Sequence, residues 1–121
     1  MKRLTLVAVL ALAALPGLAD AAQPITLRAR TAGDLAELCG ADPRSPGADA
    51  KINYCHGFAQ GAVDVELRRS GDKRPFCIPN GTSRTATMTE FVNWARSLPA
   101  HRALEAPDGL FQFLAERYPC K

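Results

Sequence analysis

Four stretches of the chain carry hydrophobic residues at the three- and four-residue spacing of an α-helix, and loops rich in proline and glycine separate them. The clearest stretch continues to about Arg69. Its apolar stripe consists of Ile52, Cys55, Ala59, Ala62 and Val63, with Phe58 and Val65 beside it. This spacing puts the stripe on one face, so the segment predicts an amphipathic helix.

Two glycines, Gly57 and Gly61, interrupt that helix and stand four residues apart on one face. Each glycine costs about 1 kcal/mol relative to alanine in a helix interior. Two such costs on the same face predict that another backbone passes close to the helix at this point.

The other three helices are predicted from their ends as much as from their apolar faces. Residues 31–34 have the pattern of a capping box and open a short helix that Gly40 ends. A helix over residues 85–98 ends at Pro99, and the last helix begins at Pro107. No stretch shows the alternation of a β-strand, so the sequence predicts an all-α domain, a small bundle of about four helices.

The first 21 residues have the pattern of a secretory signal peptide. A basic start precedes an apolar run over residues 4–15, and residues 19–21 have the small–x–small pattern of a cleavage site. The run is too short for a transmembrane helix, which needs about 20 apolar residues. We therefore expect residues 1–21 to be removed and residues 22–121 to form one domain in the periplasm, with no membrane attachment after cleavage.

Four cysteines follow the predicted cleavage site: Cys39, Cys55, Cys77 and Cys120. In an oxidising compartment an even number predicts two disulfides, for which three pairings can be written. A zinc site would need closely spaced pairs, and the gaps here are 16, 22 and 43 residues. Short connections make sequential helices antiparallel neighbours. Cys39 and Cys55 then lie at one end of the bundle and Cys77 and Cys120 at the other, which predicts the pairs Cys39–Cys55 and Cys77–Cys120.

Charge and composition exclude several functional classes. Lys and Arg number 15 against 12 Asp and Glu, and a net charge of +3 is too weak to indicate nucleic-acid binding. His56 follows Cys55 directly, but adjacent helical residues point about 100° apart, so the two cannot form a catalytic pair. The sequence has no phosphate-binding loop, metal-ligand spacing or nucleophile motif. We therefore expect a binding protein, not an enzyme, without cofactor or metal.

A set of short motifs spans most of the chain after residue 38: Tyr54-Cys55-His56-Gly57-Phe58 with Gly61 and Asp64, then Cys77-Ile78-Pro79, Leu98-Pro99 and Tyr118-Pro119-Cys120. As a set they resemble the Tai-type (amidase-resistance) immunity proteins of Gram-negative bacteria. The resemblance implies a small, helical, periplasmic protein, often a homodimer. It also implies that the protein binds and blocks a secreted cell-wall amidase, an effector of the type VI secretion system.

Two other functions stay open beside that resemblance. A periplasmic chaperone-like module of the acid-stress type would need many acidic groups that neutralise on acidification, and the sequence has no such excess. A structural protein of the cell envelope could share the fold without a toxin partner. A papain-like amidase gene next to this one would favour the immunity function over both.

The loop over residues 70–83 is the better candidate for contact with a protein partner. It is longer than the loop over residues 42–50 and is pinned at Cys77. Arg74, Phe76 and Arg84 supply the arginine and aromatic types that dominate binding energies at interfaces. We predict Arg74 and Phe76 as partner-binding residues, with the alternative that the loop is a connector whose Phe76 packs into the core.

Overall fold

The structure is a computed structural model that describes residues 24–121, so the predicted signal peptide and its cleavage site lie outside the described residues. The described part contains five helices and no strand, which confirms the all-α prediction. The helices are α1 (Ala32–Cys39), α2 (Ala48–Ser70), α3 (Arg84–Ser97), α4 (Pro99–Ala103) and α5 (Ala106–Arg117). None of them is long and apolar enough to cross a membrane.

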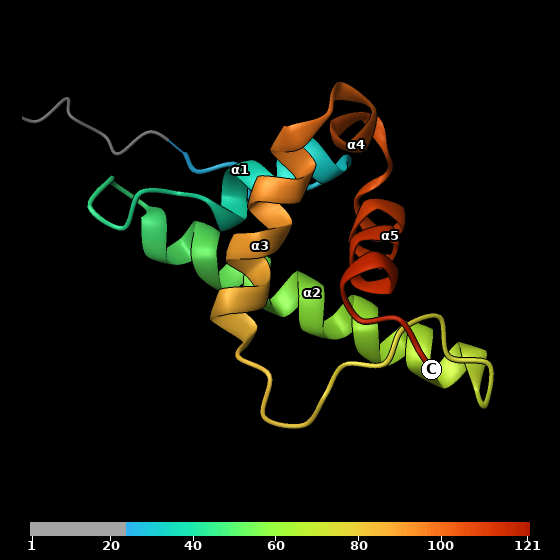
Figure 1. Cartoon of the computed structure of the whole chain (residues 1–121). Helices are drawn as coiled ribbons and strands as arrows, with labels where there is room; N and C mark the ends of the chain where they lie inside the picture. The colour runs from blue at the N-terminus through green and yellow to red at the C-terminus, as the bar shows by residue number, and fades with distance from the viewer. Residues whose placement is uncertain (1–23) are drawn as a thin grey trace, which may run out of the picture.

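The helices pack around the short helix α1, which contacts all four of the others. Figure 1 shows α3 rising to the turn of α4 and α5 returning beside α3 in the opposite direction, while the long helix α2 passes across them. Three residues of α1 are fully buried: Ala32, Leu35 and Ala36. The buried face of α1 therefore lies at the centre of the hydrophobic core, while Asp34 and Glu37 are exposed.

The N-terminus of α1 is closed by the capping box that the sequence predicts. Thr31 Oγ1 accepts a hydrogen bond from the Asp34 backbone N–H at 3.1 Å, and Asp34 Oδ2 accepts from the Thr31 N–H at 3.1 Å. Asp34 also accepts from the Arg30 N–H at 3.1 Å. The bonds from Thr31 and then Arg30 stabilise the carboxylate, so they lower the pKa of Asp34 below its usual value.

Asp34→Ala should lower the free energy of unfolding at neutral pH by about 0.3–1 kcal/mol, the range for an acidic group at a helix N-terminus. Because the folded-state pKa of Asp34 is lowered, this stability is present above the unfolded pKa and is lost as pH falls through the folded pKa. Urea unfolding of both proteins at neutral pH and near pH 2–3 measures the difference. A difference that stays constant with pH would contradict the role of the carboxylate.

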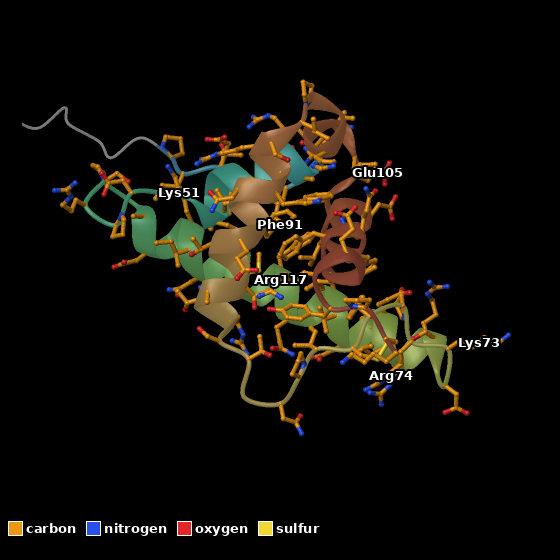
Figure 2. The ribbon with its side chains drawn as sticks, viewed as in Figure 1. Lys51, Lys73, Arg74, Phe91, Glu105 and Arg117 are labelled. Carbon is orange, nitrogen blue, oxygen red and sulfur yellow. A yellow bond between two sulfur atoms is a disulfide. The ribbon has the colours of Figure 1, made fainter. Side chains whose placement is uncertain are left out.

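The hydrophobic core is held by aromatic side chains of α3 and α5. Phe91 is fully buried, and its ring meets that of Phe113 edge to face at 5.7 Å between centroids. Trp94 stacks on His101 at 3.8 Å and donates from its indole N–H to Glu116 at 2.7 Å. These contacts join α3 to α4 and to α5, and Figure 2 labels Phe91 between α3 and α5.

The starts of α1 and α5 are joined through their backbones. The Ala32 N–H donates to the Leu104 carbonyl at 2.8 Å, and the Ala106 N–H donates to the Arg30 carbonyl at 2.9 Å. The helices approach so closely here that a Cβ atom on Gly109 would lie 2.5 Å from the Cβ of Ala32. The close helix approach of this fold is therefore at Gly109.

The predicted close approach at Gly57 and Gly61 is wrong. Both glycines are exposed, and a Cβ atom on either would meet nothing within 4 Å. They line an open groove between α2 and α5 together with Phe58, Val65 and Phe111. The propensity cost of these glycines is real, but no neighbouring backbone explains it.

Gly57→Ala should therefore raise the free energy of unfolding by about 0.5–1 kcal/mol, because alanine favours the helix and the space is empty. Gly109→Ala, the matched control, should lower it by about 1–3 kcal/mol through overpacking against Ala32. Thermal melts of the two variants show whether each substitution raises or lowers the stability. Destabilisation by Gly57→Ala would show that this face of α2 is covered in solution.

The two disulfides are the predicted pairs. Cys39 and Cys55 join the end of α1 to the first half of α2, with Cα atoms 5.1 Å apart. Cys77 and Cys120 join the loop after α2 to the segment after α5, with Cα atoms 5.0 Å apart.

Candidate functional site

The loop over residues 71–83 is extended but held at several points. The Cys77–Cys120 disulfide ties it to the segment after α5, and the Cys77 N–H donates to the Tyr118 carbonyl at 2.8 Å. A tight turn follows, in which the Thr82 hydroxyl donates to the Pro79 carbonyl at 2.6 Å. Gly81 adopts the left-handed conformation that such a turn requires, with φ 81°. The loop is therefore presented in a fixed shape.

Phe76 does not lie on the surface of this loop. Its side chain is 1% exposed and belongs to the hydrophobic core, where its ring stacks with that of Phe111 at 6.0 Å between centroids. The prediction of Phe76 as a partner-binding residue is therefore corrected: the loop needs one large apolar side chain to anchor it against α5. The alternative, that Phe76 packs into the core, is what the structure shows.

Arg74 is exposed, and no ion pair involves it within residues 24–121. Figure 2 places Lys73 and Arg74 together at the surface where the loop leaves α2. Arg74 lies near the start of the loop, whereas Arg84 follows it as the first residue of α3. A contact role for Arg74 stays a prediction.

A hollow of about 250 Å³ opens between α2, the loop over residues 71–83, the start of α3 and α5. We call it the α2–α3 hollow. Its apolar wall consists of Ala59, Val63, Ile78, Met88, Leu110 and Leu114. Met88, Leu110 and Leu114 are buried and form its interior, whereas Ile78 is 37% exposed.

The polar side chains of the α2–α3 hollow include a short chain of hydrogen bonds. Arg84 donates from Nη2 to Gln60 Oε1 at 2.7 Å, and Gln60 donates from Nε2 to Asp64 Oδ1 at 2.8 Å. No ion pair of Arg84 with a carboxylate is present in the described part of the chain. Arg84 therefore brings a positive charge to the hollow, and the neutral amide of Gln60 holds its guanidinium in place.

The ion pairs elsewhere are structural. Arg117 of α5 donates through two nitrogens to Glu90 of α3, and these hydrogen bonds lower the pKa of the Glu90 carboxyl below its usual value. Arg69 binds Glu66 in the same way within α2, at 3.0 and 2.8 Å. The first pair joins α3 to α5 at the surface, and the second pairs the buried Glu66 with the exposed Arg69.

The residues that could support metal or nucleophile chemistry do not come together in the described part of the chain. Within residues 24–121 no group of three or more His, Cys, Asp or Glu is arranged to hold a metal ion. Cys55 is bound in a disulfide, and the neighbouring His56 has a buried Nδ1 without a hydrogen-bond partner. The arrangement at these two residues does not form a nucleophile with a base.

Sequence reasoning missed the α2–α3 hollow. Its walls come from four elements that are distant in the sequence, so no local pattern reveals it. One signal was available at Arg84, which is the first residue of α3. A cation at a helix N-terminus opposes the helix dipole, and a residue that breaks a local rule is a candidate for a role in function.

Comparison with known proteins gives one match. A family model described as Rap1a immunity proteins matches residues 31–120, which include all five helices and both disulfides. No curated protein and no solved structure matches the chain.

Proposed function

We propose that this chain, which belongs to the Rap1a immunity protein family, protects the cell that makes it by binding a secreted protein effector and blocking its activity. The family match over residues 31–120 is the observation that carries the proposal. A rigid domain with a fixed loop suits an inhibitor, because little order has to be gained when it binds.

The effector in this proposal is a cell-wall amidase delivered by a type VI secretion system. The motifs around Cys55, Cys77 and Cys120 support it through their resemblance to amidase-resistance immunity proteins. The protein would act as a stoichiometric inhibitor that covers the active site of the amidase. Tight protein inhibitors bury about 1,600 Å² in total, an area that a domain of this size can supply.

The proposed place of action is the periplasm, after removal of residues 1–21. Two disulfides support this location, because such bonds persist in oxidising compartments and are rare in the cytosol. The residue pattern at the start of the chain, with a basic end and an apolar run over residues 4–15, agrees with export.

The test begins with a search for a cell-wall amidase gene beside the gene of this chain. The purified domain, residues 22–121, is mixed with the amidase, and hydrolysis of peptidoglycan is followed at increasing molar ratios. We expect activity to fall to zero near one equivalent. Full hydrolysis at a tenfold excess of the domain would contradict the proposal.

A cellular experiment tests the location. Cells that export the amidase to the periplasm should lyse unless they also make the full chain, and a chain lacking residues 1–21 should not protect them. Equal protection by the leaderless chain would contradict periplasmic action. Light scattering of the free domain separates a monomer from the homodimer that the resemblance implies.

A further inference from the structure

We propose that the α2–α3 hollow receives one apolar side chain of the effector, and that Arg84 pairs with a carboxylate beside it. This inference rests on the proposed function. It states which surface of the domain contacts the effector and which side chains of the effector that surface accepts. The partner segment is an exposed Phe, Leu or Met next to Asp or Glu.

The size of the hollow selects a single side chain as its occupant. A cavity of about 150 Å³ lined by apolar side chains is enough to hold benzene. The α2–α3 hollow has about 250 Å³, so one aromatic or branched side chain fits with its first methylene. Sites for whole small molecules are larger, roughly 300–1,000 Å³.

The interior of the hollow favours an apolar group. The Thr87 hydroxyl donates to the Ser83 carbonyl at 2.9 Å, so its oxygen accepts from the Tyr118 hydroxyl, which lies 2.9 Å away. The Thr82 hydroxyl donates to the Pro79 carbonyl. These hydroxyl protons are already used inside the protein. A polar ligand group placed here would lose its water without gaining a donor.

Arg84 is the one charged residue of the lining within residues 24–121, and it selects the charge of the partner. Its guanidinium has five N–H donors, and one hydrogen bond to Gln60 uses one of them. Arg84 is exposed, and its position at the first residue of α3 opposes the helix dipole. A carboxylate that approached here would meet both the guanidinium and the positive end of α3, and two-pronged binding is the geometry that arginine favours.

The rim of the hollow is apolar and held in a fixed position. Ile78 is 37% exposed and lies next to Cys77, whose disulfide and backbone hydrogen bond hold the loop in place. Met88, at the base, has a flexible thioether side chain that adapts to the shape of what enters. An apolar rim that is already ordered lowers the entropy that binding costs.

Two substitutions test the hollow against the catalytically inactive amidase, with affinities measured by calorimetry. Val63→Trp fills the hollow and Arg84→Glu reverses its charge. The matched controls lie on another face of α2: Val65→Trp, at a side chain that is 68% exposed, and Arg68→Glu. We expect the first two to weaken binding at least tenfold and the controls to change it less than twofold.

Circular dichroism and melting of each variant confirm that it is folded before binding is measured. Should Val63→Trp fail to fold, Arg84→Glu and Arg68→Glu still form a matched pair at exposed positions. Unchanged affinity in Arg84→Glu, or equal losses in the controls, would overturn the inference while leaving inhibition of the amidase intact.

A second measurement needs no amidase. Met88 is the one methionine after residue 21, so labelling of methionine methyl groups gives a single NMR signal for residues 22–121. At about 10 mM, in the range for weak fragments, N-acetyl-Phe-Asp-amide should shift this signal and N-acetyl-Phe-Lys-amide should shift it less. The shift should vanish in Val63→Trp. An unmoved signal in the wild-type domain, or equal shifts with both dipeptides, would overturn the inference.

Discussion

Phe76→Ala should lower the free energy of unfolding by about 3–5 kcal/mol, the usual range for removing a buried phenylalanine. Phe76 is 1% exposed, and its ring stacks with that of Phe111 on α5. The substitution leaves a cavity between the loop and α5, and the Cys77–Cys120 disulfide limits how far the loop can collapse into it. Urea unfolding followed by circular dichroism measures the loss.

Two other substitutions act as controls for this result. Phe76→Leu retains most of the apolar volume, so it should cost clearly less than Phe76→Ala. Arg74→Ala, two residues earlier and exposed, should change the free energy of unfolding by less than about 0.5 kcal/mol. A cost below 1 kcal/mol for Phe76→Ala would mean that Phe76 is not buried in solution, and its contact role would return.

Removing the Cys77–Cys120 disulfide by the double substitution Cys77→Ser and Cys120→Ser should cost about 4 kcal/mol. The bond closes a loop of 43 residues, and the entropy of the unfolded chain rises accordingly when it is absent. The loop over residues 71–83 also loses its anchor at Cys77, so affinity for the effector should fall together with stability. Denaturant unfolding and binding of the same variant give both values.

The other disulfide supplies the comparison. Cys39 and Cys55 are only 16 positions apart in the sequence, so by loop entropy alone the bond should contribute about 3 kcal/mol. Its removal should also leave the α2–α3 hollow intact, because this bond does not hold the loop over residues 71–83, which contributes Ile78 and Thr82 to the lining. Equal affinity for the effector in the Cys77–Cys120 variant and the wild type would contradict the role of that bond in positioning the loop.

The helices and the disulfide pairing could be predicted because they depend on local signals. The capping box at Thr31 and Asp34 involves four consecutive residues, and the end of α3 at Ser97 follows from Pro99. The pairing needs only the order of the helices and the end at which each cysteine lies. The two disulfide pairs are confirmed, although α2 crosses the other helices and is not the antiparallel neighbour of α3 that the prediction assumed.

The glycines could not be interpreted in the same way. A helix glycine lowers propensity equally at a close approach and beside empty space, so Gly57 and Gly109 look alike in the sequence. Only the position of Ala32, 77 residues before Gly109, separates the two cases. Phe76 posed the same difficulty, because an aromatic residue in a loop can either anchor the loop to the core or contact a partner. The stacking of Phe76 on Phe111 shows that it anchors the loop.

The chain emerges N-terminus first, so the central position of α1 determines the order in which its contacts can form. The Cys39–Cys55 bond can close once the first half of α2 has emerged. Leu104 and Ala106, whose backbones form hydrogen bonds at the start of α1, arrive some 70 residues after Ala32. Until then α1 can pack only against α2 and α3, its start lacks these backbone hydrogen bonds, and Phe76 lacks its contact with Phe111. Cys120 comes after all five helices in the sequence, so the Cys77–Cys120 bond can form only when every helix has emerged. The bond therefore stabilises the folded domain and does not direct its folding.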